Sequence, residues 1–388
     1  MKWLVDLDEA VHDEVLTAAQ AEALKRRSRA EAAGFGIAVL LVGGVVATLI
    51  GLLALAPSAT GLLGTGGLIA LGGAVALLAV GTRGRLPATA AGVVGLGAAA
   101  AGGVWMALDA TGGLFPAVWM GLALVSAGLA LRKVGPAQLS SLGAWAAVIG
   151  GAVHLVGVFG VNGPNDISPW AMLDAAVLLL ALGLFLDIRL LSALAVFALA
   201  GLLGETGYGR GSYFLAIYEP ALAILLMSAV AFVGAFAAAR LGEDWARHGR
   251  ITGLVALVWV NMAFWVGSIW GDRPGRHLFG PDRAAFPTPE AYWQARRTYI
   301  DSLPDIPELA FVVLWAVLLL AVLAWSALTA RRSVFNAAVT FAAIHFYTQW
   351  FERLDASPES IVAAGVIAIL AAWGMVRINA RFRAGETG

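Results

Sequence analysis

Residues 307–329 read PELAFVVLWAVLLLAVLAWSALT, a run of 23 residues with a single charged side chain, Glu308, near its beginning. A bilayer core about 30 Å thick is crossed by roughly 20 apolar residues in helical form, because each residue adds about 1.5 Å and every backbone polar group must be paired within its own helix. The stretch therefore predicts a membrane-spanning helix.

Eleven further stretches have a similar apolar character. The complete set of predicted spans is 34–56, 61–80, 86–108, 114–131, 138–160, 169–186, 190–204, 213–239, 251–270, 307–329, 334–351 and 360–378. We therefore expect an all-α, polytopic membrane protein with about twelve transmembrane helices. The seventh span is short, and Asp187 and Arg189 leave so little chain before it that a broken or re-entrant hairpin stays an alternative there.

The composition of the 388-residue chain agrees with this prediction and excludes several functions. Hydrophobic residues make up 60% and charged residues only 13%, with a mean hydropathy of +0.83, whereas a soluble domain carries roughly 25% charged residues. Because the 25 basic and 25 acidic side chains balance, no overall basic field attracts nucleic acid. The sequence has no cysteine, which excludes disulfides, thiolate metal sites and thiol catalysis.

The basic residues predict that both ends of the chain lie in the cytoplasm. With a cytoplasmic N-terminus and twelve spans, 18 of the 25 lysines and arginines fall on the inner side, and five of the other seven lie in one long outer loop. Lysine and arginine favour the cytoplasmic side, and long loops weigh less in this rule. Removing one span would put later basic turns such as Arg331–Arg332 on the outer side.

The spans divide the chain into five segments. These are a cytoplasmic N-terminal helical segment at 1–33, spans one to nine at 34–270, an outer loop with an interfacial helix at 271–306, spans ten to twelve at 307–378 and a cytoplasmic tail at 379–388. In the first segment Thr17 opens a helical run through Gln20, and no pattern of a cleaved secretory signal is present. The segment is either a solvated lead-in or a docking module for a cytoplasmic partner. In the outer loop Thr288 and Pro289 predict a helix start, and this helix either lies at the membrane interface or forms a lid over an outward-facing cavity.

The first four spans differ from the later ones. They consist mostly of Gly, Ala, Leu and Val, and no ionisable residue occurs between Gly34 and Val80. Small residues let helix backbones approach closely, so this half of the chain predicts scaffold packing. The later spans carry nearly all of the polar side chains expected inside the membrane.

Several of these polar side chains share one depth, which predicts a site in the outer leaflet. Ionisable residues are costly in a membrane and by default mark a functional site. From a rise of about 1.5 Å per residue, we expect four of them to lie roughly 7–10 Å below the outer surface. These four are His154, Asp174, Glu219 and His345. The candidate substrate-binding or relay residues are His154, Asp174, Glu205, Arg210, Tyr213, Glu219, Asn261, Trp265, His345 and Gln349.

Each candidate also has a structural interpretation. His154 can hydrogen-bond a neighbouring helix, Asp174 can complement the positive end of its own helix, and Glu205 can form a rim salt bridge with Arg210. Pro220 is expected to kink the eighth helix beside Glu219, which lies about six residues into it.

The candidates form no known catalytic or cofactor motif. A divalent metal held by the histidines and carboxylates has no local ligand motif behind it, so we assign no metal, and the cofactor stays unknown. The sequence has no Gly-rich phosphate loop and no Gly-x-Ser-x-Gly elbow. Whether the protein is an enzyme is left open.

Two segments near the ends of the chain resemble a bacterial family. They are residues 16–24, LTAAQAEAL, followed by a span, and residues 346–354, FYTQWFERL, followed by Ser357, Pro358 and Gly365. These segments look like those of the bacterial membrane proteins grouped as domain of unknown function family 2157 (DUF2157). The resemblance covers about a quarter of the chain and implies a multi-pass protein of the bacterial inner membrane. That family has no established activity to carry over.

The leading hypothesis for function is a transporter or permease for a small solute. Twelve spans with both ends inside is a common carrier plan, and histidine–carboxylate relays couple protons to transport. One alternative is a membrane-embedded enzyme acting on a lipid-linked or periplasmic substrate, and another is a structural or assembly subunit of a membrane complex. The expected partners are the lipid bilayer and a small-molecule or lipid-linked ligand, without nucleic acid.

Overall fold

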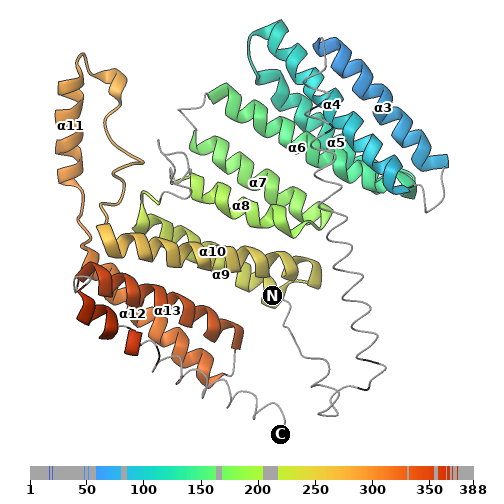
Figure 1. Ribbon diagram of the computed structural model, residues 1–388. Helices are drawn as coiled ribbons and strands as arrows, with labels where there is room; N and C mark the ends of the chain where they lie inside the picture. Colours follow the sequence, from blue (N-terminus) through green and yellow to red (C-terminus); the bar gives the residue numbers. More distant parts are fainter. Residues whose placement is uncertain are drawn as a thin grey trace. The chain divides into compact units, whose positions relative to one another are not determined.

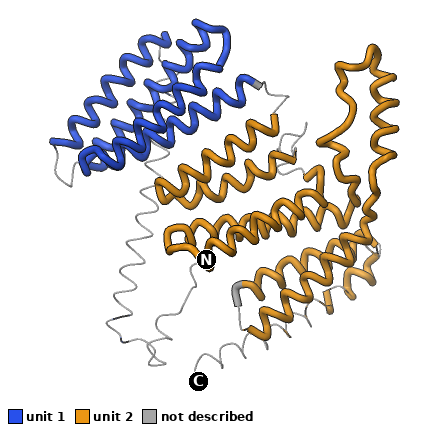
Figure 2. Tube along the Cα trace, turned by 180° about the vertical axis from the view of Figure 1, so that it is seen from behind, with its two compact units in different colours: residues 1–166 blue, residues 167–388 orange. Residues whose placement is uncertain are grey.

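The computed structural model describes residues 58–79, 85–162, 168–203, 217–329, 332–353, 357–363 and 365–367, together with Thr17, Gln20, Thr48, Gly51, Ile369 and Gly374. The secondary structure of these residues is helical (Figure 1), apart from an isolated bridge between Asp272 and Ile306. The chain forms two compact units, Met1–Asp166 and Ile167–Gly388 (Figure 2). The predicted all-α class is confirmed.

Unit 1 contains two antiparallel helix pairs. α3 (Ala59–Ala79) packs on α4 (Arg85–Thr111), and α5 (Phe115–Val134) packs on α6 (Ser140–Asn162). The short 3-10 helix η2 (Ala137–Leu139) leads into α6, and α4 also contacts α6.

Glycines bring the paired helices of unit 1 into backbone contact. A Cβ atom on Gly66 of α3 would lie 2.8 Å from the carbonyl oxygen of Gly95 on α4, and a Cβ atom on Gly128 of α5 would lie 2.6 Å from the carbonyl oxygen of Gly143 on α6. Real side chains do not approach a backbone so closely, so these positions require glycine. The predicted close packing through small residues is confirmed for these helices.

Unit 2 is built from three helix pairs (Figure 1). α7 (Pro169–Leu186) pairs with α8 (Arg189–Gly201), α9 (Pro220–Arg240) with α10 (Glu243–Trp270), and α12 (Glu308–Leu328) with α13 (Arg332–Arg353). α10 also contacts α8 and α12, so it is the central helix of this unit. The 3-10 helix η3 (Arg283–Ala285) and α11 (Pro289–Ser302) lie in the segment between α10 and α12.

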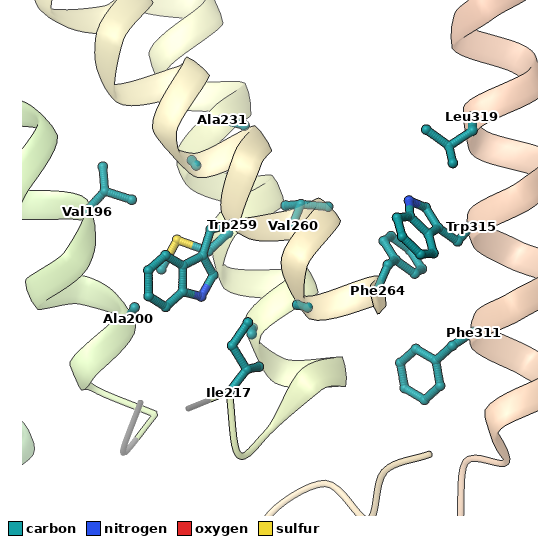
Figure 3. Close-up of a cluster of buried hydrophobic side chains, with 14 residues drawn as sticks. Val196, Ala200, Ile217, Ala231, Trp259, Val260, Phe264, Phe311, Trp315 and Leu319 are labelled. Carbon is teal, nitrogen blue, oxygen red and sulfur yellow. The ribbon is translucent and has the colours of Figure 1, made fainter. Parts of the chain in front are cut away.

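The core of unit 2 lies on two sides of α10 (Figure 3). Trp259 of α10 points toward Val196 of α8, while Phe264 of α10 stacks on Trp315 of α12 with ring centroids 6.3 Å apart and planes inclined by 8°. Aromatic pairs of this kind add about 0.5–1.5 kcal/mol beyond the burial of their area. Apolar packing therefore joins α8, α10 and α12.

Short sequence signals explain where several helices begin and end. The Ser168 hydroxyl accepts a hydrogen bond from the Trp170 amide at 3.2 Å, and α7 ends at Asp187, whose backbone is left-handed with a φ of 56°. The Thr288 hydroxyl accepts from the Ala291 amide at 3.3 Å, which confirms the predicted start of α11. Such N-caps satisfy backbone donors that the first helical turn leaves unpaired.

The described residues of the N-terminal segment form a capping box. The Thr17 amide donates to Gln20 Oε1 at 2.9 Å, and the Gln20 amide donates to Thr17 Oγ1 at 3.2 Å. This reciprocal pair confirms the predicted helix start at Thr17. The remainder of 1–33 and the tail at 379–388 lie outside the described residues.

Eight helices in the described ranges are long and apolar enough to cross a membrane, namely α3, α4, α5, α6, α7, α9, α10 and α12. The predicted first span and much of the twelfth lie outside the described residues. α8, the predicted seventh span, has 13 residues, which is about 20 Å of helix and less than a bilayer core. α13, the predicted eleventh, has 22 residues but includes polar ones such as Asn336, His345 and Gln349.

The outward faces of the long helices are apolar. Leu68, Phe232 and Leu320 are 72%, 72% and 65% exposed, and many other leucines and valines accompany them. Contiguous apolar surface on this scale is unfavourable in water at about 25 cal/mol per Å², whereas a bilayer accepts it. The chain is therefore a multi-pass membrane protein.

Candidate functional site

The structure brings together four of the ten candidate residues. Glu205, Arg210 and Tyr213 lie outside the described residues; His154 lies on α6 of unit 1, Asp174 on α7, Glu219 directly before α9, Asn261 and Trp265 on α10, and His345 and Gln349 on α13. The last four line neighbouring faces of α10 and α13.

His154 makes an interhelical hydrogen bond within unit 1. Its Nδ1 atom lies 3.0 Å from the carbonyl oxygen of Val118 on α5, and its side chain is buried. A Cβ atom on Gly121 would meet the Cα of His154 at 2.6 Å, so α5 and α6 touch at this point. This geometry agrees with the structural interpretation of His154. Asp174 is half-buried on α7.

A polar seam runs between α10, α12 and α13. It consists of Asn261, Trp265 and Ser268 on α10, Trp315 on α12, and His345, Thr348 and Gln349 on α13. The Trp315 indole donates to Asn261 Oδ1 at 3.0 Å, and the Trp265 indole donates to Thr348 Oγ1 at 2.8 Å. The Gln349 amide donates to Ser268 Oγ at 3.2 Å. The α10 residues recur at every three or four positions, so they share one face of that helix.

Two polar atoms of α13 are buried without a hydrogen-bond partner in the described part of the chain. They are Nδ1 of His345 and Nε1 of Trp350. The His345 ring lies edge-on to Trp315, with centroids 4.7 Å apart. An unpaired buried polar group costs about 1–3 kcal/mol, and the His345 nitrogen is the atom of the seam that carries this cost in the described part of the chain.

Glu219 and Asp272 form a second site, the carboxylate pair, where α9 meets the segment after α10. Glu219 is completely buried, and its two carboxylate oxygens accept hydrogen bonds from the amides of Gly275 and His277, each at 2.6 Å. Asp272 Oδ2 accepts from the Ala221 amide at 2.8 Å and so caps α9. The pair fixes the start of the segment between α10 and α12 to the N-terminus of α9.

The position of Glu219 differs from the prediction. It precedes α9 instead of lying about six residues inside a helix, because Pro220 occupies the first helical position rather than a kink. Proline suits that position, since its fixed φ fits the helix and its missing N–H would be unpaired there in any case. Glu219 therefore bonds to the segment between α10 and α12 rather than to the polar seam.

Asp272 is destabilised as an anion. Burial raises the pKa of Asp272 most, and the nearby charge of Glu219 raises it further, whereas the hydrogen bond from Ala221 and the charge of Arg276 act in the opposite direction. Its second oxygen, Oδ1, is buried without a partner among the described residues. A proton on this carboxyl removes the repulsion between the two acids.

The raised pKa of Asp272 predicts that stability falls as pH rises. The folded protein holds this proton more tightly than the unfolded chain does. The resulting contribution to stability is fully present below the ordinary pKa of 3.8 and is lost as pH rises through the pKa of the folded state. We expect Asp272→Asn to remove this decline, because asparagine is never charged and its Oδ1 can still accept from Ala221. Thermal unfolding in detergent between about pH 4 and pH 7 measures the difference.

Asp282→Asn is the matched control for that experiment. Asp282 is an exposed carboxylate of the same segment that also caps a backbone amide, that of Ala284, at 2.9 Å. This variant should keep the pH dependence of the wild type. An unchanged pH dependence in Asp272→Asn would contradict the assignment of this titration to Asp272.

A third polar cluster, which the sequence did not reveal, lies at the other end of α10. The Ser192 hydroxyl lies 2.7 Å from His248 Nδ1, and His248 Nε2 lies 3.2 Å from Asp187 Oδ1. Serine, histidine and carboxylate in line are the groups that hydrolases use to activate a nucleophile. Ser192 and His248 are fully buried, however, and Ser192 packs directly on Gly183, so a substrate cannot reach the hydroxyl.

This cluster instead ties the α7–α8 turn to α10. Asp187 is half-exposed and also faces Arg247 at 3.4 Å. No local motif predicts these contacts, since His248 is 56 residues from Ser192 and 61 from Asp187. The one signal was His248 itself, because the chain has only five histidines.

The donor sets do not point to a metal centre. Within the described ranges, no group of three or more His, Cys, Asp or Glu side chains is placed to hold a metal ion. The polar seam offers neutral donors and acceptors, and the carboxylate pair uses three of its four oxygens for backbone amides. Both arrangements suit hydrogen bonding or proton binding more than metal ligation.

Comparisons with known proteins add no family to this description. No protein-family model, no curated protein and no solved structure matches the chain.

Proposed function

We propose that this membrane protein is a transporter for a small polar solute, with its path along the polar seam. The supporting observation is the Nδ1 atom of His345, which is buried in the seam with no partner in the described residues. Ionisable residues inside membrane proteins line substrate and ion pathways, and a solute or a coupled proton would satisfy this nitrogen.

The chemistry of the polar seam favours a neutral polar solute. Its side chains are an amide pair, two hydroxyls, two indoles and an imidazole, which offer donors and acceptors without a fixed charge. Toward the end of α13, Arg353 donates to Gln349 Oε1 at 2.8 Å. This arginine is the charged group that the described contacts place beside the seam.

Cysteine accessibility tests whether water and solute enter the polar seam. The chain has no cysteine, so each introduced thiol is the only one. We expect His345→Cys and Gln349→Cys to react with a small membrane-impermeant thiol reagent at least about tenfold faster than Tyr347→Cys, because a thiol must ionise in water to react. Tyr347 is on the same helix but exposed on its outer surface, where lipid excludes water.

The side of the membrane from which the reagent reacts distinguishes a transporter from an enzyme and from a structural subunit. Reaction from the outside in right-side-out vesicles and from the cytoplasmic face in inverted vesicles supports transport. Reaction from one side alone indicates a closed pocket and favours a membrane-embedded enzyme. No reaction at either seam position contradicts the proposal and favours a structural or assembly subunit.

The topology and location belong to the same proposal. We infer about twelve spans with both termini in the cytoplasm from the bias of basic residues, and a bacterial inner-membrane location from the resemblance to DUF2157. Residues 1–33 are proposed to face the cytoplasm, where a partner can dock. Single cysteines introduced in the segment 271–306 test this orientation, because a membrane-impermeant thiol reagent should reach all of them from the outer side.

A further inference from the structure

The segment between α10 and α12 is held together as one body. Arg273 bonds the carboxylates of Asp301 and Asp305 at 3.2 and 3.0 Å, and the Tyr299 hydroxyl donates to the Gly275 carbonyl oxygen at 3.0 Å. Both Figure 1 and Figure 2 show α11 running beside the chain that precedes it. Because Glu219 also binds Gly275, this body is fixed to α9.

Four arginines of this body have no carboxylate partner among the described residues. They are Arg276, Arg283, Arg296 and Arg297. Among the carboxylates of the segment, Asp301 and Asp305 bind Arg273 and Asp272 is buried, which leaves Asp282 and Glu290 exposed. We refer to the four arginines without a carboxylate partner as the basic surface.

Arg276 and Arg296 lie next to each other on this surface. Arg296 Nη2 donates to the Arg276 carbonyl oxygen at 2.9 Å, and Arg276 Nε donates to His277 Nε2 at 2.8 Å. Each guanidinium keeps further N–H groups for a ligand. The pKa of His277 is lowered mainly by its partial burial and secondly by the positive charge of Arg276. Its imidazole accepts the hydrogen bond from Arg276 and so orients that side chain.

Exposed aromatic side chains accompany the arginines. Phe279 is 65% exposed and Trp293 is 55% exposed, while Arg283 lies 5.6 Å over the ring of Tyr292. The segment is joined at both ends to membrane-length helices, α10 and α12. Aromatic and basic side chains together at this level are typical of the layer where lipid headgroups meet water.

We infer that this basic surface, centred on Arg276 and Arg296, binds the phosphate of an anionic phospholipid headgroup. Two arginines present paired N–H donors that match phosphate oxygens, and Phe279 and Trp293 supply apolar contact for the glycerol and acyl region. Residues 271–306 contain five arginines and five carboxylates, but the described contacts leave four arginines and two exposed carboxylates, Asp282 and Glu290, without an ion pair, so the exposed charge is positive. The inference is independent of the transport proposal.

Native mass spectrometry of the full chain in detergent tests the inference. We expect the wild type to retain phosphatidylglycerol in preference to phosphatidylcholine of the same acyl chains. Replacing both arginines, in Arg276→Gln/Arg296→Gln, should reduce this preference by about fivefold for each arginine. Arg276→Lys/Arg296→Lys keeps the charge but not the paired donors, so it should keep part of the preference and exceed the glutamine variant, which shows that the loss in the glutamine variant is not misfolding.

Arg250→Gln is the matched control, because Arg250 is an exposed arginine at the other end of α10, paired with Glu243 at 3.3 Å. It should leave lipid retention unchanged. Equal retention of the two lipids by the wild type overturns the inference, and so does a preference that survives in the double glutamine variant. If inorganic phosphate displaces phosphatidylglycerol and stabilises the lipid-free protein equally well, the ligand is a soluble anion and the lipid assignment is wrong.

Discussion

Glu219→Ala is expected to release the segment between α10 and α12 from the start of α9. The variant leaves the amides of Gly275 and His277, which now bond to a buried carboxylate, without acceptors. Hydrogen bonds to a charged group contribute roughly 1.5–3 kcal/mol each, so the loss of two amounts to about 3–6 kcal/mol of local stability. Amide hydrogen exchange at residues 273–279 should accelerate by at least about a hundredfold.

Glu290→Ala is the control for this prediction. Glu290 is an exposed carboxylate in the first turn of α11, and no hydrogen bond or ion pair in the described residues holds its side chain. Exchange in the segment should stay at the wild-type rate in this variant. The same rate in Glu219→Ala would show that the segment is held by other contacts, such as those of Arg273.

The exchange experiment also separates two roles for Glu219. As a residue that positions the segment, it acts through the backbone amides, and its removal changes exchange first. If Glu219 is a proton relay, as the sequence suggests, Glu219→Gln should abolish activity. One hydrogen bond from a backbone amide and most of the protection from exchange should then remain. The buried carboxylate with both oxygens occupied favours the positioning role.

Gly66→Leu is expected to separate α3 from α4, whereas Gly67→Leu is not. A Cβ atom on Gly66 would meet backbone atoms of Gly95 and Ala98, both at 2.8 Å, while a Cβ atom on Gly67 has nothing within 4 Å. Backbone atoms cannot move aside as a flexible side chain can, so Gly66→Leu should cost about 3 kcal/mol. Gly67→Leu adds an apolar side chain on an exposed face and should stay within about 0.5 kcal/mol of the wild type.

Thermal unfolding of the two variants in the same detergent measures this difference. The pair is closely matched, because the residues are adjacent, share one helix and receive the same side chain. Gly72 and Gly73 repeat the contrast one or two turns further along α3, since Gly72 faces open space and Gly73 contacts Gly92. Equal stability of Gly66→Leu and Gly67→Leu would mean that α3 and α4 do not pack through these glycines.

The parts of the fold that the sequence predicted correctly are those with local causes. α7 spans Pro169–Leu186, as predicted, because Ser168 caps its start and Asp187 ends it. The start of α11 at Thr288 has the same kind of origin. The close packing of α3 with α4 followed from composition, since glycine and alanine alone let backbones touch.

The candidate site was predictable only where one helix carries it. His345 and Gln349 lie four residues apart, so a shared face was certain once α13 was helical. Their partners on α10 and α12 are set by long-range packing, and Trp315 gave no sign of its bond to Asn261. The expected depth of Glu219 was also wrong, because α9 begins at Pro220 and not at the predicted residue 213, so the Glu219 side chain bonds to a different element.

The turn between α7 and α8 has a consequence for how the protein is made. Only Asp187 and Ile188 separate the two helices, and Ser192 lies directly against Gly183 across the turn. α7 and α8 can therefore pair as soon as both have been synthesised. His248 is made 56 residues after Ser192, so the bond between them can form only after both of these helices have been made.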